Sequence, residues 1–310
     1  MKIAVTGGAG FIGRWVVKKL LADNHDVIVL DNLSNGSIEN IKEFQGKPNF
    51  TFSYSDVTNK LQVENSLKGI DICLHLAAQI NVQESLDLPH KSFESNITGT
   101  YNVLECCRKN DAKIMLVGTC MVYDFALSKP INEEHPIKLR SPYAGSKAAA
   151  EDLAISYFYG YGLPVAIARP FNTYGPFQKS NMESGVVSIF IKKYLADEDL
   201  QVYGSGEQTR DLLYVEDCAN FLVKMAFCKE AVGQVINAGM GKDITINDLA
   251  FLICKDKSRI KHVQHHHPQS EIPKLVCDYS KAKRLLGWEA QTSLEQGIAK
   301  TIRWMKNGDT

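Results

Sequence analysis

Short runs of apolar and β-branched residues alternate with stretches of helical period along the first part of the chain. Runs such as KIAVT (2–6) and DVIVL (26–30) are almost continuously apolar, which is typical of strands buried on both faces. Further runs of this kind occupy 49–54, 71–77, 112–118 and 163–169, and the helical stretches between runs occupy 11–22, 37–44, 60–67, 87–109 and 142–160. This alternation predicts an α/β fold in which a parallel sheet carries helices on both faces.

The alternation ends after Arg169 and gives way to loops rich in proline and glycine. Two short strands are predicted near 200–203 and 211–215, and helices near 216–228, 245–256 and 293–306. We therefore expect residues 1–170 to form the sheet domain. Residues 171–310 should form mainly a smaller C-terminal lobe, some segments of which can return to the sheet.

Composition excludes several classes of partner. The chain has 310 residues, of which 45% are hydrophobic, and its 35 basic and 35 acidic side chains cancel. No net field attracts nucleic acid or an anionic membrane, and no apolar run reaches the roughly 20 residues of a membrane span. Met1 leads directly into a strand, and the eight cysteines show no CxxC spacing. We expect a cytoplasmic protein that acts on small molecules.

The segment TGGAGFIG (6–13) carries a dinucleotide-binding pattern. Gly8, Gly10 and Gly13 form a G-x-G-x-x-G frame after a predicted strand and at the start of a predicted helix. Asp31 follows 18 residues after Gly13, where a carboxylate can bind an adenine ribose diol and repel a 2'-phosphate. The pattern predicts a Rossmann-type doubly wound sheet that binds NAD rather than NADP. Asp56 can contact the adenine amine or cap the next helix.

Tyr143 and Lys147 stand one helical turn apart, so both side chains project from one face of a predicted helix. An ammonium group stabilises a nearby phenolate, and a phenolate can remove a proton from a sugar hydroxyl. Tyr279 and Lys283 repeat this spacing at a helix start that is typical of a surface. Thr119 ends a predicted strand 24 residues before Tyr143, which favours the first pair as the reactive one.

Several motifs in order give the chain a resemblance to a known family. It resembles the extended short-chain dehydrogenase/reductase family of NAD-dependent nucleotide-sugar epimerases and dehydratases, and in particular the UDP-glucose and UDP-N-acetylglucosamine 4-epimerases. The motifs are TGGAGFIG, HLAAQ (75–79), SPYAGSK (141–147), RPFNTYGP (169–176), GSGEQTRDLLYVED (204–217) and LLGW (285–288).

The resemblance implies roles for individual residues. Tyr143 would be the base on the sugar 4-hydroxyl, Thr119 would bind the same oxygen, and Lys147 would tune Tyr143 and hold the nicotinamide ribose. Cofactor contacts would also come from Gly7, Gly10, Phe11, Ile12, Asp31, Asn32, Asn35, Asp56, Val57, Leu76, Ala77, Ala78, Asn96 and Pro170. Substrate contacts would come from Ser85, Thr119, Asn172, Tyr203, Arg210 and Leu275. The family habit also implies a homodimer through the helices at 87–109 and 142–160.

Some of these positions have plainer interpretations. Tyr203 can be a strand core residue, and Ser85 a helix-start hydroxyl. Relatives usually have an arginine where this chain has Pro268, in HHHPQSEI (265–272), so His266 or His267 would have to replace it as a phosphate donor. Three consecutive histidines also suggest a metal, but no second ligand cluster accompanies them. We expect an exposed loop there and no metal site.

The residues after Thr119 bear on the reaction. Dehydratases of the family usually carry a glutamate two places after this threonine, whereas this chain has Cys120 and Met121. C4 epimerisation needs only the triad, so it is the preferred hypothesis. The alternative is a 4,6- or 5,6-elimination assisted by Cys120, since some 5,6-dehydratase-like relatives have Thr-Cys followed by glutamate; otherwise Cys120 only fills the pocket wall.

Two further hypotheses concern function and substrate. A catalytically silent NAD-sensing protein is a remote alternative, against which the complete triad argues. For the substrate, family members that exclude N-acetyl sugars have a bulky aromatic residue at the position that aligns with Leu275. Leucine leaves more room there, which favours a UDP-N-acetylhexosamine alongside UDP-hexoses.

Overall fold

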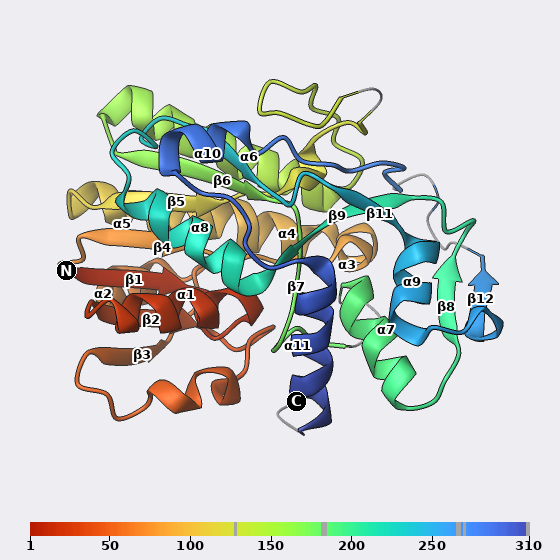
Figure 1. Ribbon diagram of the computed structural model, residues 1–310. Helices are drawn as coiled ribbons and strands as arrows, with labels where there is room; N and C mark the ends of the chain where they lie inside the picture. Colours follow the sequence, from red (N-terminus) through yellow and green to blue (C-terminus); the bar gives the residue numbers. More distant parts are fainter. Residues whose placement is uncertain (127–128, 181–184, 265–267, 269–270, 308–310) are drawn as a thin grey trace.

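A seven-stranded parallel sheet forms the centre of the computed structural model, which describes residues 1–126, 129–180, 185–264, 268 and 271–307 (Figure 1). Its strands are β1 (Lys2–Thr6), β2 (Asp26–Asp31), β3 (Phe50–Tyr54), β4 (Ile72–His75), β5 (Lys113–Val117), β6 (Val165–Pro170) and β10 (Val235–Ala238). They lie in the order β10-β6-β5-β4-β1-β2-β3, and all neighbours are parallel. The predicted doubly wound sheet is confirmed. The order reverses between β1 and β4, which places a crevice at their carboxyl ends.

Helices cover both faces of the sheet. One face carries α1 (Phe11–Ala22), α8 (Val215–Phe227) and α10 (Ser280–Leu286), and the other carries α2 (Lys60–Ser66), α5 (Gly99–Lys109) and α6 (Pro142–Tyr161). Successive residues of a strand pack into the hydrophobic cores on opposite faces of the sheet. Ile3 and Val5 of β1 pack beneath α1 and α8, whereas Ala4 packs beneath α5 and α6. This double burial explains why the strands read as continuous apolar runs.

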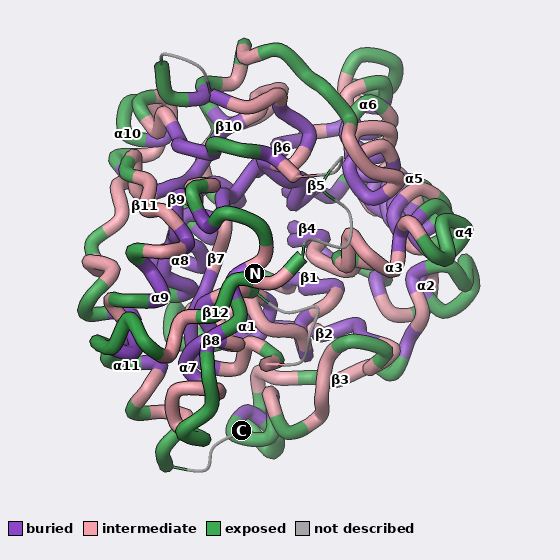
Figure 2. Tube along the Cα trace, turned by 90° about the vertical axis from the view of Figure 1, so that its right-hand side faces the viewer, coloured by how far each residue is buried: buried purple, intermediate pink, exposed green. Residues whose placement is uncertain are grey.

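A smaller lobe lies beyond the carboxyl ends of the strands (Figure 1). It contains a three-stranded sheet, a parallel pair and three helices. These are β7 (Asn172–Tyr174), β9 (Thr209–Tyr214) and β11 (Asp243–Thr245); β8 (Leu200–Tyr203) and β12 (Ile260–Val263); and α7 (Val186–Leu195), α9 (Ile246–Cys254) and α11 (Leu294–Lys306). Phe190, Leu249 and Ile298 belong to its separate core. In the burial view, buried segments run through both parts (Figure 2).

The region expected as one helix over 87–109 is more divided than predicted. A separate helix, α3 (Val82–Asp87), ends where this region begins. The region itself contains α4 (Pro89–Phe93) and a π-helical turn at Glu94–Thr98 that continues into α5. Pro89 begins α4 at a position where its missing N–H costs no hydrogen bond, and this separates α4 from α3. The helical stretch expected at 37–44 is a 3-10 helix, Ile38–Phe44.

One segment of the second part of the chain returns to the main sheet, as the sequence analysis allowed: the strand β10 pairs with β6 at the edge of that sheet. Helix α7 and strands β7, β10, β11 and β12 were not predicted, whereas α10 lies at the helix start expected around Tyr279. No helix in the described part of the chain is long and apolar enough to cross a membrane.

Candidate active site

The Gly-rich loop joins β1 to α1 and leaves backbone N–H groups available at the helix start. Gly7 adopts a φ of 68°, and a Cβ on Gly13 would lie 2.1 Å from the Gly7 carbonyl oxygen. Gly10 precedes α1 and offers no side chain to cap its first turn. Uncapped amides at a helix N-terminus suit a pyrophosphate. Phe11 and Ile12 form that first turn.

Asp31 ends β2 beside this loop. Its Oδ2 accepts the Ala9 N–H at 3.0 Å, and its Oδ1 accepts the Leu33 N–H at 2.8 Å. Burial raises the pKa of the carboxyl group, although these two hydrogen bonds oppose the shift. Each oxygen retains a lone pair, so the carboxylate can still accept from a ribose diol.

The expected adenine-side residues lie around the next turn. Asn32 donates to Asp56 Oδ2 at 2.9 Å, and the other Asp56 oxygen accepts from the backbone and hydroxyl of Thr58. Asp56 therefore closes a turn, while the cap of α2 is Asn59. Asn35 is exposed, whereas Val57 is buried.

Residues 76–78 follow β4 and pack against the Gly-rich loop. A Cβ on Gly7 would lie 2.8 Å from the Ala77 nitrogen, and the Ala77 N–H donates to the Thr6 hydroxyl at 3.1 Å. Leu76 and Ala78 flank it, and both are half-buried. Asn96 supports the same segment, because it bonds the Gln79 backbone in both directions and donates to Ser146 of α6 at 2.9 Å.

The expected triad meets at the carboxyl end of β5. Thr119 follows that strand, and its hydroxyl is a hydrogen-bond partner of the Tyr143 hydroxyl. Lys147 lies one turn further along α6, and its Nζ donates to the Val117 carbonyl at 2.6 Å. All three side chains are buried. Burial raises the pKa of Tyr143 to about 12 and lowers that of Lys147 to about 8.

Cys120 points into an apolar cluster beside the triad. The cluster includes Phe171, Ile272 and Leu275, and Cys120 is only 3% exposed. Burial raises the pKa of its thiol to about 12, so a thiolate is disfavoured at neutral pH. Met121, half-buried, packs against the same cluster.

The proposed substrate residues are dispersed around this cluster. Arg210 of β9 donates to the Thr209 and Ile272 carbonyls, each at 2.8 Å, and pairs with Glu271. Asn172 begins β7 directly after Pro170 and Phe171. Its buried Oδ1 has no hydrogen bond within the described residues, so it can receive a donor from a ligand.

Two substrate positions are less persuasive. Ser85 lies inside α3, and its hydroxyl donates to the Val82 carbonyl at 2.6 Å, which occupies its hydrogen. The cap of α3 is Asn81, so Ser85 is not the helix-start hydroxyl of the plainer interpretation. Tyr203 ends β8 and is half-buried.

The sequence analysis missed charged and polar residues behind the triad. Glu151 of α6 and Arg169 of β6 form a buried ion pair, and His75 lies between the hydroxyls of Thr6 and Thr100. Burial lowers the pKa of His75 to about 3, so it is neutral. The spacing of Glu151, four residues after Lys147, was the available signal.

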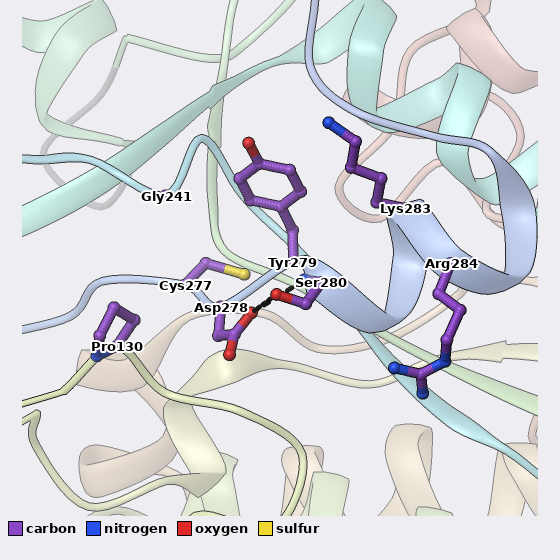
Figure 3. A pocket seen from close by; sticks show the side chains of 8 residues that line it. All are labelled: Pro130, Gly241, Cys277, Asp278, Tyr279, Ser280, Lys283 and Arg284. Carbon is purple, nitrogen blue, oxygen red and sulfur yellow. Dashed lines mark hydrogen bonds between the residues drawn. The ribbon is translucent and has the colours of Figure 1, made fainter.

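The second tyrosine–lysine pair has different surroundings. Tyr279 and Lys283 line an open pocket of about 510 Å³ at the start of α10, together with Cys277 and Pro130 (Figure 3). Lys283 is largely exposed and pairs with Glu289 at 2.7 Å. Tyr279 also packs against the apolar cluster that contains Cys120, but neither Thr119 nor any residue of the Gly-rich loop lines this pocket.

The described residues contain no group of three histidine, cysteine or acidic side chains that could hold a metal. The histidines at 265–267 lie outside the described residues.

Comparison with known proteins identifies the family. The family model described as GDP-mannose 4,6 dehydratase matches residues 4–301. The chain belongs to the nucleotide-sugar epimerase/dehydratase family. A UDP-glucose 4-epimerase of Mycolicibacterium smegmatis is 33% identical over 99% of both chains. UDP-glucuronic acid decarboxylase 1 of Danio rerio is 35% identical over 98% of this chain and 72% of its own length.

Solved structures place this epimerase/dehydratase among similar folds. Pal from Bacillus thuringiensis is 54% identical, with a TM-score of 0.97 over 99% of both chains. A UDP-glucose 4-epimerase of Thermotoga maritima, solved with UDP-glucose, is 32% identical, with a TM-score of 0.93 over 99% of both chains. DesIV, a dTDP-glucose 4,6-dehydratase of Streptomyces venezuelae solved with NAD, is 29% identical, with a TM-score of 0.93 over 99% of this chain and 97% of its own. Relatives of this family therefore carry out several reactions.

Proposed function

We propose that the protein is an NAD-dependent nucleotide-sugar 4-epimerase that acts on a UDP-hexose or UDP-N-acetylhexosamine. The observation that carries the proposal is the meeting of Thr119, Tyr143 and Lys147 at the end of β5, with no carboxylate at positions 120 and 121. The uncapped start of α1 and the Asp31 carboxylate fit a dinucleotide. Solved relatives with NAD support the same cofactor.

The side chains divide the proton chemistry between them. Tyr143 removes the proton of the sugar 4-hydroxyl, and Thr119 binds the same oxygen and aligns it with the phenol. Lys147 supplies positive charge that favours the phenolate. The Gly-rich loop and Asp31 would hold NAD, which would supply reversible hydride transfer at C4 of the sugar. Asn172 and Arg210 would hold the diphosphate while the sugar rotates in the pocket.

The neighbours of Thr119 support epimerisation over elimination. Removal of a C5 proton requires a base, and a methionine thioether cannot act as one. The Cys120 thiol is protonated at neutral pH because burial raises its pKa. An elimination would therefore lack its usual base in this pocket.

Substrate, assembly and location are further parts of the proposal. Leu275 lies in the apolar cluster beside Cys120, and leucine there leaves room for an N-acetyl group.

An apolar stripe at helical spacing is formed by Phe93, Ile97 and Tyr101. Phe93 and Tyr101 are more than 40% exposed, which supports a homodimer through this face. Eight free cysteines support a reducing compartment such as the cytoplasm.

Incubation with a panel of nucleotide sugars in D2O, followed by NMR of the products, tests the reaction. We expect C4-inverted products from UDP-hexoses and UDP-N-acetylhexosamines, with no deuterium at C5. Deuterium at C5 or C6, or a lost hydroxyl group, would indicate elimination instead. Binding of NAD without turnover of any sugar would favour the NAD-sensing alternative.

Replacing Cys120 by serine tests whether this residue only fills the pocket wall or takes part in the chemistry through its thiol. We expect kcat within about threefold of wild type, because serine is of similar size and the thiol takes no part in epimerisation. The same NMR assay measures it. A loss of about 100-fold or more would assign chemistry to the thiol and favour the elimination hypothesis.

A further inference from the structure

Glu151 lies on the same face of α6 as the two reactive residues of that helix. It follows Lys147 by four positions and Tyr143 by eight, so the three side chains form one row. The residue is only 3% exposed. A buried carboxylate is costly unless it is paired, and one beside a proton-transfer site is a candidate for a functional role.

Arg169 binds only one of the two carboxylate oxygens. Its Nε and Nη2 both donate to Glu151 Oε2, at 2.9 and 2.6 Å. The other oxygen, Oε1, is buried and has no hydrogen bond of ordinary geometry within the described residues. A Cβ on Gly118 would lie 1.9 Å from Oε1, so this oxygen lies against the backbone that leads into Thr119. The Thr119 N–H acts on the same carboxylate and lowers its pKa.

The arginine is itself fixed from the other side. Its guanidinium lies over the Tyr123 ring, 4.8 Å from the centroid. The Tyr123 hydroxyl donates to Asn237 Oδ1 of β10 at 2.9 Å. The position of the Glu151 carboxylate is therefore determined by contacts from β6, β10 and the 3-10 helix segment Cys120–Val122 with its flanking Tyr123.

The charge of Glu151 acts on the reactive residues. Burial lowers the pKa of Lys147, and Glu151 opposes this shift. Tyr143, one turn earlier on α6, and His75 of β4 are the further titratable groups beside Lys147, and His75 is neutral and supplies no charge. Glu151 also raises the pKa of Tyr143, so its carboxylate affects the two other residues of the row.

We propose that Glu151 is a positioning residue, which holds the Gly118–Thr119 backbone against the catalytic row and presents its carboxylate to Lys147 one helical turn away. The proposal rests on the epimerase function above. It assigns no contact with substrate or cofactor to Glu151. Its effect would pass through Thr119 and Lys147.

The test compares three variants by their pH–rate profiles in the epimerase assay. Glu151→Gln keeps the shape and removes the charge, whereas Glu151→Asp keeps the charge and withdraws it by one methylene. Asp217→Asn is the matched control, since Asp217 is also a buried carboxylate that accepts a backbone N–H, from Thr292 at 2.9 Å, but lies on α8 across the sheet.

The wild-type rate should fall as the pH rises above about 8, because Lys147 then loses its proton. In E151Q, loss of the carboxylate should shift this alkaline limb of the pH–rate profile at least about one pH unit lower. E151D should restore the limb towards its wild-type position, and D217N should leave it unmoved. A uniform loss of kcat in E151Q with an unmoved limb would show a merely structural role and overturn the proposal.

Arg169 would be left buried and unpaired in E151Q, which can prevent folding. The double variant E151Q/R169M removes both charges and so avoids an unpaired buried arginine. Its pH–rate profile should show the same shifted alkaline limb as that of E151Q. Titration of 13Cε-labelled lysine by NMR, with the Lys147 signal assigned by K147R, measures the lysine directly without turnover. A Lys147 titration unchanged in the double variant would overturn the inference even if the sugars react, whereas a lowered titration with no sugar turned over would leave it standing and reject the epimerase.

Discussion

Replacing Tyr143 by phenylalanine should lower kcat for C4 epimerisation about 1,000-fold, because the phenol is the proposed base and general-base catalysis contributes factors of this size. KM should change little, since phenylalanine fills the same buried space. Initial rates of product formation by NMR measure both constants.

Tyr279→Phe provides the control for this variant. Tyr279 has the same spacing to a lysine but lines the open pocket at α10. The epimerisation rate of the Tyr279→Phe variant should therefore equal that of wild type. If Y143F kept more than about a tenth of the wild-type activity, the base would have to be another group.

Gly13→Ala should lower both the free energy of unfolding and the affinity for NAD. The new Cβ would lie 2.1 Å from the Gly7 carbonyl oxygen and 2.8 Å from the Gly8 Cα, and both are backbone atoms that cannot swing aside. The start of α1 must then move away from the loop, at a cost of about 3 kcal/mol or more. Urea unfolding and calorimetric titration with NAD measure the two effects.

Gly160→Ala is the matched control for the added methyl group. Nothing lies within 4 Å of a Cβ at Gly160, which is inside α6, so alanine should stabilise the helix by up to about 1 kcal/mol. Unchanged NAD affinity in G13A would contradict the assignment of this loop to the cofactor.

The central sheet was predictable because its strands are buried on both faces. KIAVT and DVIVL carry no polar alternation, and each is followed by a helical or loop stretch of the right length. The edge strand β10 was not predicted. Only four residues long, it pairs with β6 across a long stretch of chain, and no local pattern encodes that partner. The division of 87–109 depended on Pro89, which the helical period conceals.

The reactive residues were predictable for a different reason. Tyr143 and Lys147 have a spacing that a second pair repeats, and their position after the strand that ends near Thr119 distinguished them. Glu151 was missed because a carboxylate on a helix usually belongs to a solvated face. Its burial depends on Arg169, which is distant in sequence and adjacent in space.

The edge position of β10 has a consequence for synthesis of the protein on the ribosome. All six residues of β6 are buried, and their outer edge is covered by residues 235–238. A nascent chain that has emerged only as far as β6 exposes an apolar edge strand, which is a template for association with other chains. The sheet can close only after some 65 further residues have left the exit tunnel. That interval lasts seconds at ordinary rates of translation, and the edge of β6 stays open throughout it.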